Sequence, residues 1–204
     1  MEIQSKVIKN TDNSSPVKAY ATIFLNNNIA IHGFRIIDIG TDDNDAMFVA
    51  MPSNRNSDGK YYDMAFPTRS EVKEDIINSV IKNYVDNSSS QLADKSPVDM
   101  KITVRLHKTT AYGDNVPASG EIRLSDSFVI SGIKITCRDG TIDYEMPKIK
   151  GKDGNYHDMA VPLNDRFRQL LKEKVLSEYG LLSTQILCGN MNHAELTAEG
   201  EVAY

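Results

Sequence analysis

Small and aliphatic residues occupy every second position in residues 17–26, and polar or aromatic residues take the positions between them. The face predicted to be buried consists of Ala19, Ala21, Ile23 and Leu25. A period of two is typical of a strand with one face in a core. Asn26 to Asn28 follow and favour a tight turn, because asparagine tolerates the left-handed backbone conformation. Residues 17–39 are therefore predicted to form a hairpin, with further strands over residues 2–9, 46–51 and 61–65.

The apolar period changes from two to nearly four after Pro67. The residues that recur at this spacing are Val72, Ile76, Val80 and Tyr84. They predict an amphipathic helix that packs one face against the sheet. Thr68 and Glu71 have the spacing of a capping box at its start.

The same order of elements occurs a second time. Residues 51–67 (MPSNRNSDGKYYDMAFP) and 146–162 (MPKIKGKDGNYHDMAVP) are identical at nine of seventeen positions without a gap. A match at fixed spacing indicates a tandem duplication. The second copy is predicted to contain strands over residues 100–108, 116–125, 128–137, 141–146 and 155–160, followed by a helix over residues 164–179.

The second helix has its own start and stop signals. Asn164 or Asp165 is predicted to cap it, and Gly180 stands where a glycine commonly ends a helix. Residues 181–188 allow an extra strand, and the residues from His193 onward are expected to be poorly ordered.

The predicted organisation is two domains in one chain of 204 residues. Its parts are a first repeat (1–85), a Ser-rich linker (86–98), a second repeat (99–180) and a C-terminal tail (181–204). A copy of about 80 residues buries only a thin core, and an isolated sheet has open edges. We therefore expect an α+β fold in which each copy is an antiparallel sheet followed by a helix, and the copies pack as an intramolecular pseudo-dimer. The alternative is two domains that do not touch.

Residues 48–67, FVAMPSNRNSDGKYYDMAFP, resemble the SpoVG family of bacterial septation and sporulation regulators. The second copy shows the same motif more loosely. The resemblance implies that two copies associate through their sheets, and that the protein is a nucleic-acid-binding (DNA or RNA) regulator of septation, sporulation or gene expression. The chain departs from the family pattern at Asn54, where a basic residue is expected, and at Tyr62 and Phe66, where the family has arginine or histidine.

Composition adds few constraints. The net charge is −5, with 40% hydrophobic and 25% charged residues, which is ordinary for a globular protein. No apolar run approaches the roughly 20 residues that span a membrane, and the first ten residues lack the apolar core of a signal peptide. These features predict a cytoplasmic protein without membrane contact. Two cysteines, Cys137 and Cys188, are too few for the disulfide framework of a secreted domain.

Charge is distributed unevenly between the copies. Residues 1–85 contain 9 basic and 11 acidic residues, whereas residues 99–180 contain 13 basic and 12 acidic residues. Lysine and arginine neutralise phosphates without reading bases, which predicts weakly sequence-specific binding. The predicted nucleic-acid-binding residues lie mainly in the second copy and are Lys148, Lys150, Lys152, Arg166 and Arg168, with a smaller contribution from Arg55 and Lys60 of the first copy.

Aromatic residues near these cations are candidates for stacking on bases: Tyr61, Tyr62, Tyr156 and His157. The residues alone leave alternatives open. The basic side chains form a solvated surface, or the chain is a protein-interaction or structural module that keeps the fold without binding nucleic acid. A higher oligomer is also compatible with the sequence.

No pattern points to catalysis or to a cofactor. Asp63 and Asp158 recur in both copies, but an aspartate near a strand-to-helix corner commonly bonds backbone amides, so a structural role is predicted. The histidines have no metal-ligand spacing, and a phosphate-binding glycine loop and a nucleophile elbow are both lacking. Cys188 and His193 are close in sequence but have no glycine loop to stabilise an oxyanion. The chain is therefore not expected to be an enzyme.

Overall fold

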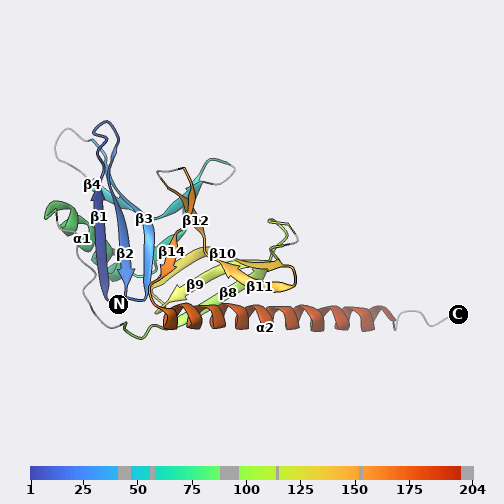
Figure 1. Ribbon diagram of the computed structural model, residues 1–204. Helices are drawn as coiled ribbons and strands as arrows, with labels where there is room; N and C mark the ends of the chain where they lie inside the picture. Colours follow the sequence, from blue (N-terminus) through green and yellow to red (C-terminus); the bar gives the residue numbers. More distant parts are fainter. Residues whose placement is uncertain (41–46, 56–57, 88–96, 114, 152–153, 199–204) are drawn as a thin grey trace.

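The computed structural model of the protein describes residues 1–40, 47–55, 58–87, 97–113, 115–151 and 154–198, with side chains through Ser183. Two five-stranded antiparallel sheets, each followed in the chain by a helix, form the body of the molecule (Figure 1). This is the predicted α+β architecture.

Each sheet combines four strands of one copy with a short strand of the other. The first contains β1 (Ile3–Lys9), β2 (Val17–Leu25), β3 (Ile29–Asp38) and β4 (Met47–Ala50), with β14 (Ala160–Pro162) added beside β3. The second contains β8 (Ile102–Lys108), β9 (Ala118–Leu124), β10 (Phe128–Arg138) and β11 (Thr141–Glu145), with β7 (Ala65–Pro67) added beside β10. Helix α1 (Ser70–Val85) covers the first sheet, and α2 (Asp165–Ala198) runs along the second and continues past its edge (Figure 1).

The predicted hairpin over residues 17–39 is confirmed. Ala19, Ile23 and Leu25 are completely buried, as the alternation predicts. Asn26 and Asn27 have φ angles of 51° and 52°, which lie in the left-handed region that asparagine tolerates. The turn therefore pairs β2 with β3 as an antiparallel hairpin.

The apolar faces of both helices are confirmed. The buried residues are Val72, Ile76 and Val80 of α1 and Phe167, Leu171 and Val175 of α2. Tyr84 and Tyr179, which end the two stripes, are partly buried against the same core. The two helices therefore occupy equivalent positions on their sheets.

The helix ends differ from the prediction at the start of α1 and at the end of α2, and agree with it at the start of α2. The Thr68 hydroxyl makes no cap for α1, because it donates to the backbone oxygen of Asp126 in the second copy. Asn164 does cap α2: its Oδ1 accepts a hydrogen bond of 2.8 Å from the Phe167 amide. Gly180 does not end α2, and residues 181–188 are helical rather than a strand. Glycine inside a helix costs only about 1 kcal/mol relative to alanine, which neighbouring turns offset.

The strands predicted over residues 61–65 and 155–160 are each divided in two. The first copy has β6 (Tyr61–Asp63) and β7, and the second has β13 (Tyr156–Asp158) and β14. The two parts of each pair belong to different sheets, because the chain turns at Met64 and at Met159 toward the other copy. Both methionines are buried at these turns.

The copies thus exchange strands reciprocally. Ala65 pairs with Ile130, and Ala160 pairs with Ile31 at the equivalent place. Each exchanged strand covers an otherwise open part of a sheet, which removes exposed backbone donors and acceptors. One continuous core joins residues of both copies. The expected pseudo-dimer is therefore present, and the alternative of two domains without contact is wrong.

Candidate nucleic-acid interface

Two short hairpins rise from the centre of the molecule, where the strands are exchanged (Figure 1). Arm 1 consists of β5 (Ser53–Arg55) and β6, and arm 2 consists of β12 (Lys148–Lys150) and β13. Each arm follows a buried Met-Pro pair and continues into the exchanged strand of its copy. The exchange therefore decides where both arms stand.

The two arms lie side by side. A Cβ atom placed on Gly33 would be 3.1 Å from Cδ1 of Ile149 in arm 2 and 3.4 Å from Cβ of Pro52 at the base of arm 1. Side chains of both arms also line one groove, among them Asn54 and Lys148. Asn54 and Lys148, which are 94 positions apart in the chain, thus line the same space.

The arms carry four of the seven predicted cations within the described residues. Arg55 Nε donates to the backbone oxygen of Gly59 at 2.9 Å, and its guanidinium group lies 5.9 Å from the centre of the Tyr61 ring. Lys60 is exposed near the tip of arm 1. Lys148 and Lys150 are exposed on β12. Lys152 lies outside the described residues.

Arg166 and Arg168 stand elsewhere. They lie in the first turn of α2, at the opposite end of β14 from arm 2 (Figure 1). Arg166 Nη2 is 3.4 Å from Oδ1 of Asp99, and Arg168 Nη1 is 2.6 Å from Oδ1 of Asp165. The predicted cations therefore form two zones rather than one, and the arginine zone already contains carboxylates.

Comparison with known families identifies the repeated unit. The model of the SpoVG family matches residues 1–86 and residues 100–180. The chain belongs to the SpoVG family. It contains the SpoVG unit twice, in agreement with the duplication and with the two sheet-and-helix units.

The SpoVG relatives include three bacterial proteins, each described as a candidate septation protein SpoVG. The Macrococcus caseolyticus protein is 44% identical over 70 residues, which cover 34% of this chain and 57% of the relative. The Brevibacillus brevis protein is 34% identical over 84 residues, which cover 41% of this chain and 84% of that relative. The Staphylococcus haemolyticus protein is 31% identical over 96 residues, which cover 47% of this chain and 91% of that relative. The chain thus matches little more than half the length of the first relative.

The departures from the SpoVG pattern have distinct positions in the structure. Asn54 is exposed on arm 1, where its Oδ1 accepts a hydrogen bond of 2.8 Å from the Arg55 amide. Tyr62 faces the second copy, whereas Phe66 lies on the exchanged strand and pairs with Val129. Two of the three changes therefore fall where the copies meet.

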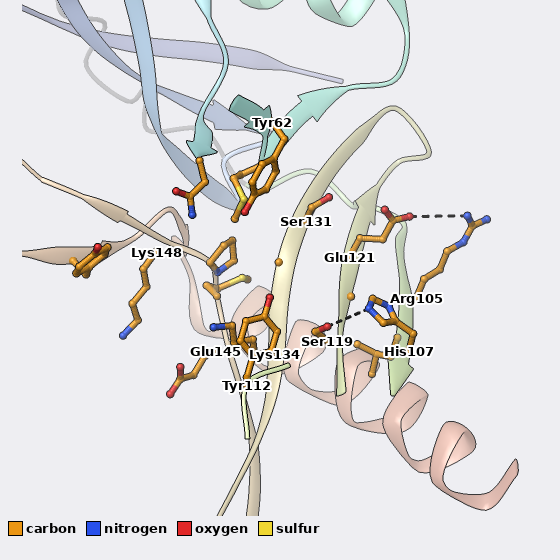
Figure 2. A pocket seen from close by; sticks show the side chains of 18 residues that line it. Tyr62, Arg105, His107, Tyr112, Ser119, Glu121, Ser131, Lys134, Glu145 and Lys148 are labelled. Atoms are coloured by element: carbon orange, nitrogen blue, oxygen red, sulfur yellow. Dashed lines mark hydrogen bonds and ion pairs between the residues drawn. The ribbon is translucent and has the colours of Figure 1, made fainter. Parts of the chain in front are cut away.

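A groove of about 680 Å³ lies between the arms and the face of the second sheet that points away from α2 (Figure 2). We call this space the groove. Its sheet side carries Arg105, His107, Ser119, Glu121 and Lys134, and its arm side carries Asn54, Tyr62, Lys148 and Tyr156. The sequence analysis missed the sheet-side residues as site candidates.

A signal for these residues is present in the sequence. Arg105 and His107 alternate with the buried Val104, so they belong to the outer face of β8. The alternation of buried and exposed residues along β8 therefore indicates that the outer face of this strand is polar. It does not indicate that the arms cover this face, since the covering hairpin belongs to the other copy.

A second contact between copies involves two histidines. His32 of β3 and His157 of β13 line a common small cavity beneath arm 2. His32 Nδ1 and Thr22 Oγ1 share a hydrogen bond of 2.9 Å. Burial, with a smaller electrostatic contribution from His157, lowers the pKa of His32 below 6.5. The neutral imidazole is therefore favoured in the folded protein.

Asp63 and Asp158 are exposed at the ends of β6 and β13. They pair in register with Ser53 and Lys148, at the bases of the two arms. Among the residues with described side chains, no three histidine, cysteine or acidic groups converge in a way that would hold a metal ion. No helix in the described part of the chain is long and apolar enough to cross a membrane.

Proposed function

We propose that this SpoVG-family chain is a regulatory protein that binds DNA or RNA through its two arms, with arm 2 supplying most of the phosphate contacts. The observation that carries the proposal is the pairing of two hairpins that both present exposed cations: Arg55, Lys60, Lys148 and Lys150. Cations spread over neighbouring hairpins neutralise several phosphates at once. Such contacts position a backbone without reading its sequence.

Arm 2 takes the larger share because its lysines are consecutive outward positions of one strand. Lys148 and Lys150 alternate with the partly buried Ile149, so both point to the same side of β12. Lys152 continues this run in the sequence and belongs to the same proposed contact. On arm 1 the family's basic position is Asn54, which leaves fewer charges there.

Arg166 and Arg168 form a separate proposed contact at the start of α2. Their ion pairs with Asp99 and Asp165 are exposed, and exposed pairs contribute about 0–1 kcal/mol. A phosphate can therefore replace either carboxylate at small cost. We expect this zone to add affinity only for ligands long enough to extend past β14.

The relatives are described as septation proteins, which supports a role in septation. Regulation of sporulation or gene expression is the wider part of the proposal. The proposed binding would serve that role through contact with a gene or transcript. Weak sequence preference is expected, since the proposed arm contacts are to phosphates.

The test measures affinity for duplex DNA, single-stranded DNA and RNA at several salt concentrations. The variant is Lys148→Glu/Lys150→Glu, and its matched control is Lys73→Glu/Lys82→Glu on α1, which changes net charge equally. On duplex DNA the slope of log affinity against log salt should fall in magnitude by about 2 in the arm variant, at about 0.9 per lost phosphate contact. The control should keep the slope of the unmodified protein.

Two other results would redirect the proposal. Loss of binding in Arg55→Glu/Lys60→Glu, with binding kept in the arm 2 variant, would reverse the roles assigned to the arms. Failure of the unmodified protein to bind any of the three polymers would refute the proposal and favour a protein-interaction module with the same fold.

A further inference from the structure

The groove between the arms and the second sheet shares only Lys148 with the phosphate contacts proposed above. We propose that it binds unpaired nucleotides of a single-stranded nucleic acid, with a base held against Tyr62. This inference rests on the proposed nucleic-acid function and names the strand type that reaches this site. Its parts are a floor without bulky side chains, three aromatic rings and an excess of cations.

Two glycines and two serines form part of the floor of the groove. Gly120 and Gly132 belong to β9 and β10, and both line the groove. A Cβ atom on Gly132 would lie 2.8 Å from Cε of Met64, which shows how closely arm 1 approaches the sheet there. Beside them stand the small side chains of Ser119 and Ser131 (Figure 2). A volume of about 680 Å³ is in the range of sites for nucleotide-sized ligands.

Aromatic rings enter the groove from three different segments. Tyr62 comes from arm 1, Tyr156 from arm 2 and Tyr112 from the loop after β8. Their exposed fractions are 47%, 68% and 51%, so each has ring surface free for a ligand. A flat base stacks on such rings whatever its identity. Bases inside a duplex already stack on one another, so this surface favours unpaired strands.

The charges in the groove leave an excess of cations. Glu121 Oε1 lies 2.9 Å from Arg123 Nε and 4.0 Å from Arg105 Nη1, and Glu145 Oε1 lies 2.8 Å from Arg138 Nη2, so each carboxylate is already paired with arginine. The Nζ atom of Lys134 lies 3.9 Å from the centre of the Tyr112 ring, over its face. This lysine lines the groove together with Arg105 and Lys148.

These cations suit a phosphate on either side of a stacked base. Lys148 belongs to arm 2, and Arg105 and Lys134 belong to the sheet side of the groove. A strand that runs from arm 2 across the groove would therefore meet cations at both ends. Ser119 and His107, which share a hydrogen bond of 3.2 Å, supply polar atoms for base edges between them.

The equivalent surface of the first sheet is different. Ile149 occupies the position on arm 2 that Asn54 has on arm 1, and its Cδ1 lies over Gly33. His157 stands where arm 1 has Tyr62. Apolar side chains lie against both glycines, Ile149 against Gly33 and Met64 against Gly132, so the difference between the two surfaces is the tyrosine, which is replaced by histidine on arm 2. We therefore infer one such groove site per chain.

The experiment uses the full chain with a 12-nucleotide oligo(dT) and a blunt duplex of the same length, both labelled for anisotropy. Tyr62→Ala should weaken binding of oligo(dT) by at least about fivefold, the effect of losing about 1 kcal/mol of stacking. Its affinity for the duplex should change less than twofold. Tyr62→Phe, which keeps the ring, should leave both affinities unchanged, and His157→Ala, the matched position on arm 2, should weaken oligo(dT) binding less than Tyr62→Ala does.

Three results would overturn the groove site while leaving the arm contacts intact. One is equal loss of duplex and oligo(dT) binding in Tyr62→Ala, and another is an equal effect of His157→Ala. The third is binding of thymidine monophosphate as tightly as oligo(dT), which would mean a free nucleotide as the ligand. By contrast, if Lys148→Glu/Lys150→Glu has no effect on either polymer, the arm contacts fail independently.

Photocrosslinking gives a readout that needs no variant. An oligonucleotide that carries 5-iodouracil should crosslink to Tyr62, Tyr112 or Tyr156, as mapped by mass spectrometry of the irradiated complex. Crosslinks found only at residues outside the groove would contradict the proposal.

Discussion

The contact between Met64 of the first copy and Gly132 of the second provides a direct test of how the copies pack. Gly132 has a φ of 87° and lies in the bulge of β10 between Ser131 and Ile133. Alanine there would place its Cβ 2.8 Å from Met64 Cε. Met64 is 6% exposed, and its Cε, the end of a flexible side chain, must shift to admit the added carbon.

The expected cost of Gly132→Ala has separate parts. Left-handed backbone strain in a residue other than glycine costs about 1–3 kcal/mol, and reduced freedom of the unfolded chain offsets about 0.4–1 kcal/mol of it. Displacing Met64 from its rotamer adds about 0.5–1.5 kcal/mol. The free energy of unfolding should therefore fall by about 0.5–4 kcal/mol.

Gly113→Ala is the matched control. Its φ is 81°, but no atom lies within 4 Å of the added Cβ, so it has the backbone strain without the contact. Urea unfolding of the full chain should show a larger loss for Gly132→Ala than for Gly113→Ala. Met64→Leu, which removes the terminal methyl group, should reduce the cost of Gly132→Ala by at least about 0.5 kcal/mol in a double-mutant cycle.

Two results together would refute this contact. The two glycine variants would lose the same free energy of unfolding, and the effects of Gly132→Ala and Met64→Leu would simply add in the double variant. That outcome would mean that Met64 does not lie over the bulge of β10. The account of how arm 1 approaches the second sheet would then need revision.

Three further predictions concern stability. Residues 1–86 and residues 98–204, expressed separately, should not fold as stable monomers, because each lacks the strand that the other supplies; a half that melts cooperatively at the temperature of the whole chain, with monomeric sedimentation, would contradict this. The lowered pKa of His32 means that the unfolded chain takes up more protons than the folded chain just below pH 6.5, so stability should fall as pH decreases through this window. Urea titrations at several pH values should show a flatter profile for His32→Gln, and an unchanged profile would exclude His32 as the cause. Asn164→Ala should cost about 1–2 kcal/mol by loss of the α2 cap, measured by thermal unfolding, whereas Asp165→Ala should cost less.

The sequence by itself determined the local structure and the duplication. The alternation around Ala19 and Ile23 predicts the strand because only one face of a sheet packs on the core, and the structure buries that face. The spacing of Val72 and Ile76 predicts the first helix in the same way. The aligned Met-Pro and Asp-Gly pairs identify the repeat. These predictions succeed because the period of a strand or a helix follows from local backbone geometry, so the order of apolar residues along the chain is enough to identify the buried face.

Only the tertiary structure decided which sheet each strand joins. The three residues of β7 are too few to show a period, and the turn at Met64 leads them to the other copy. Short strands find partners through available edges, and no local pattern specifies an edge formed more than 60 residues later in the chain.

The arrangement of the candidate site follows from the same exchange. It sets arm 1 beside arm 2 and over the outer face of the second sheet, which creates the groove. It also leaves Arg166 and Arg168 at the far end of β14 from the arm lysines, although the sequence separates Lys150 from Arg166 by only 16 positions. Residue types and spacing therefore predicted which side chains carry positive charge, whereas strand pairing decided which of them face the same space, because their distances depend on contacts between the two copies.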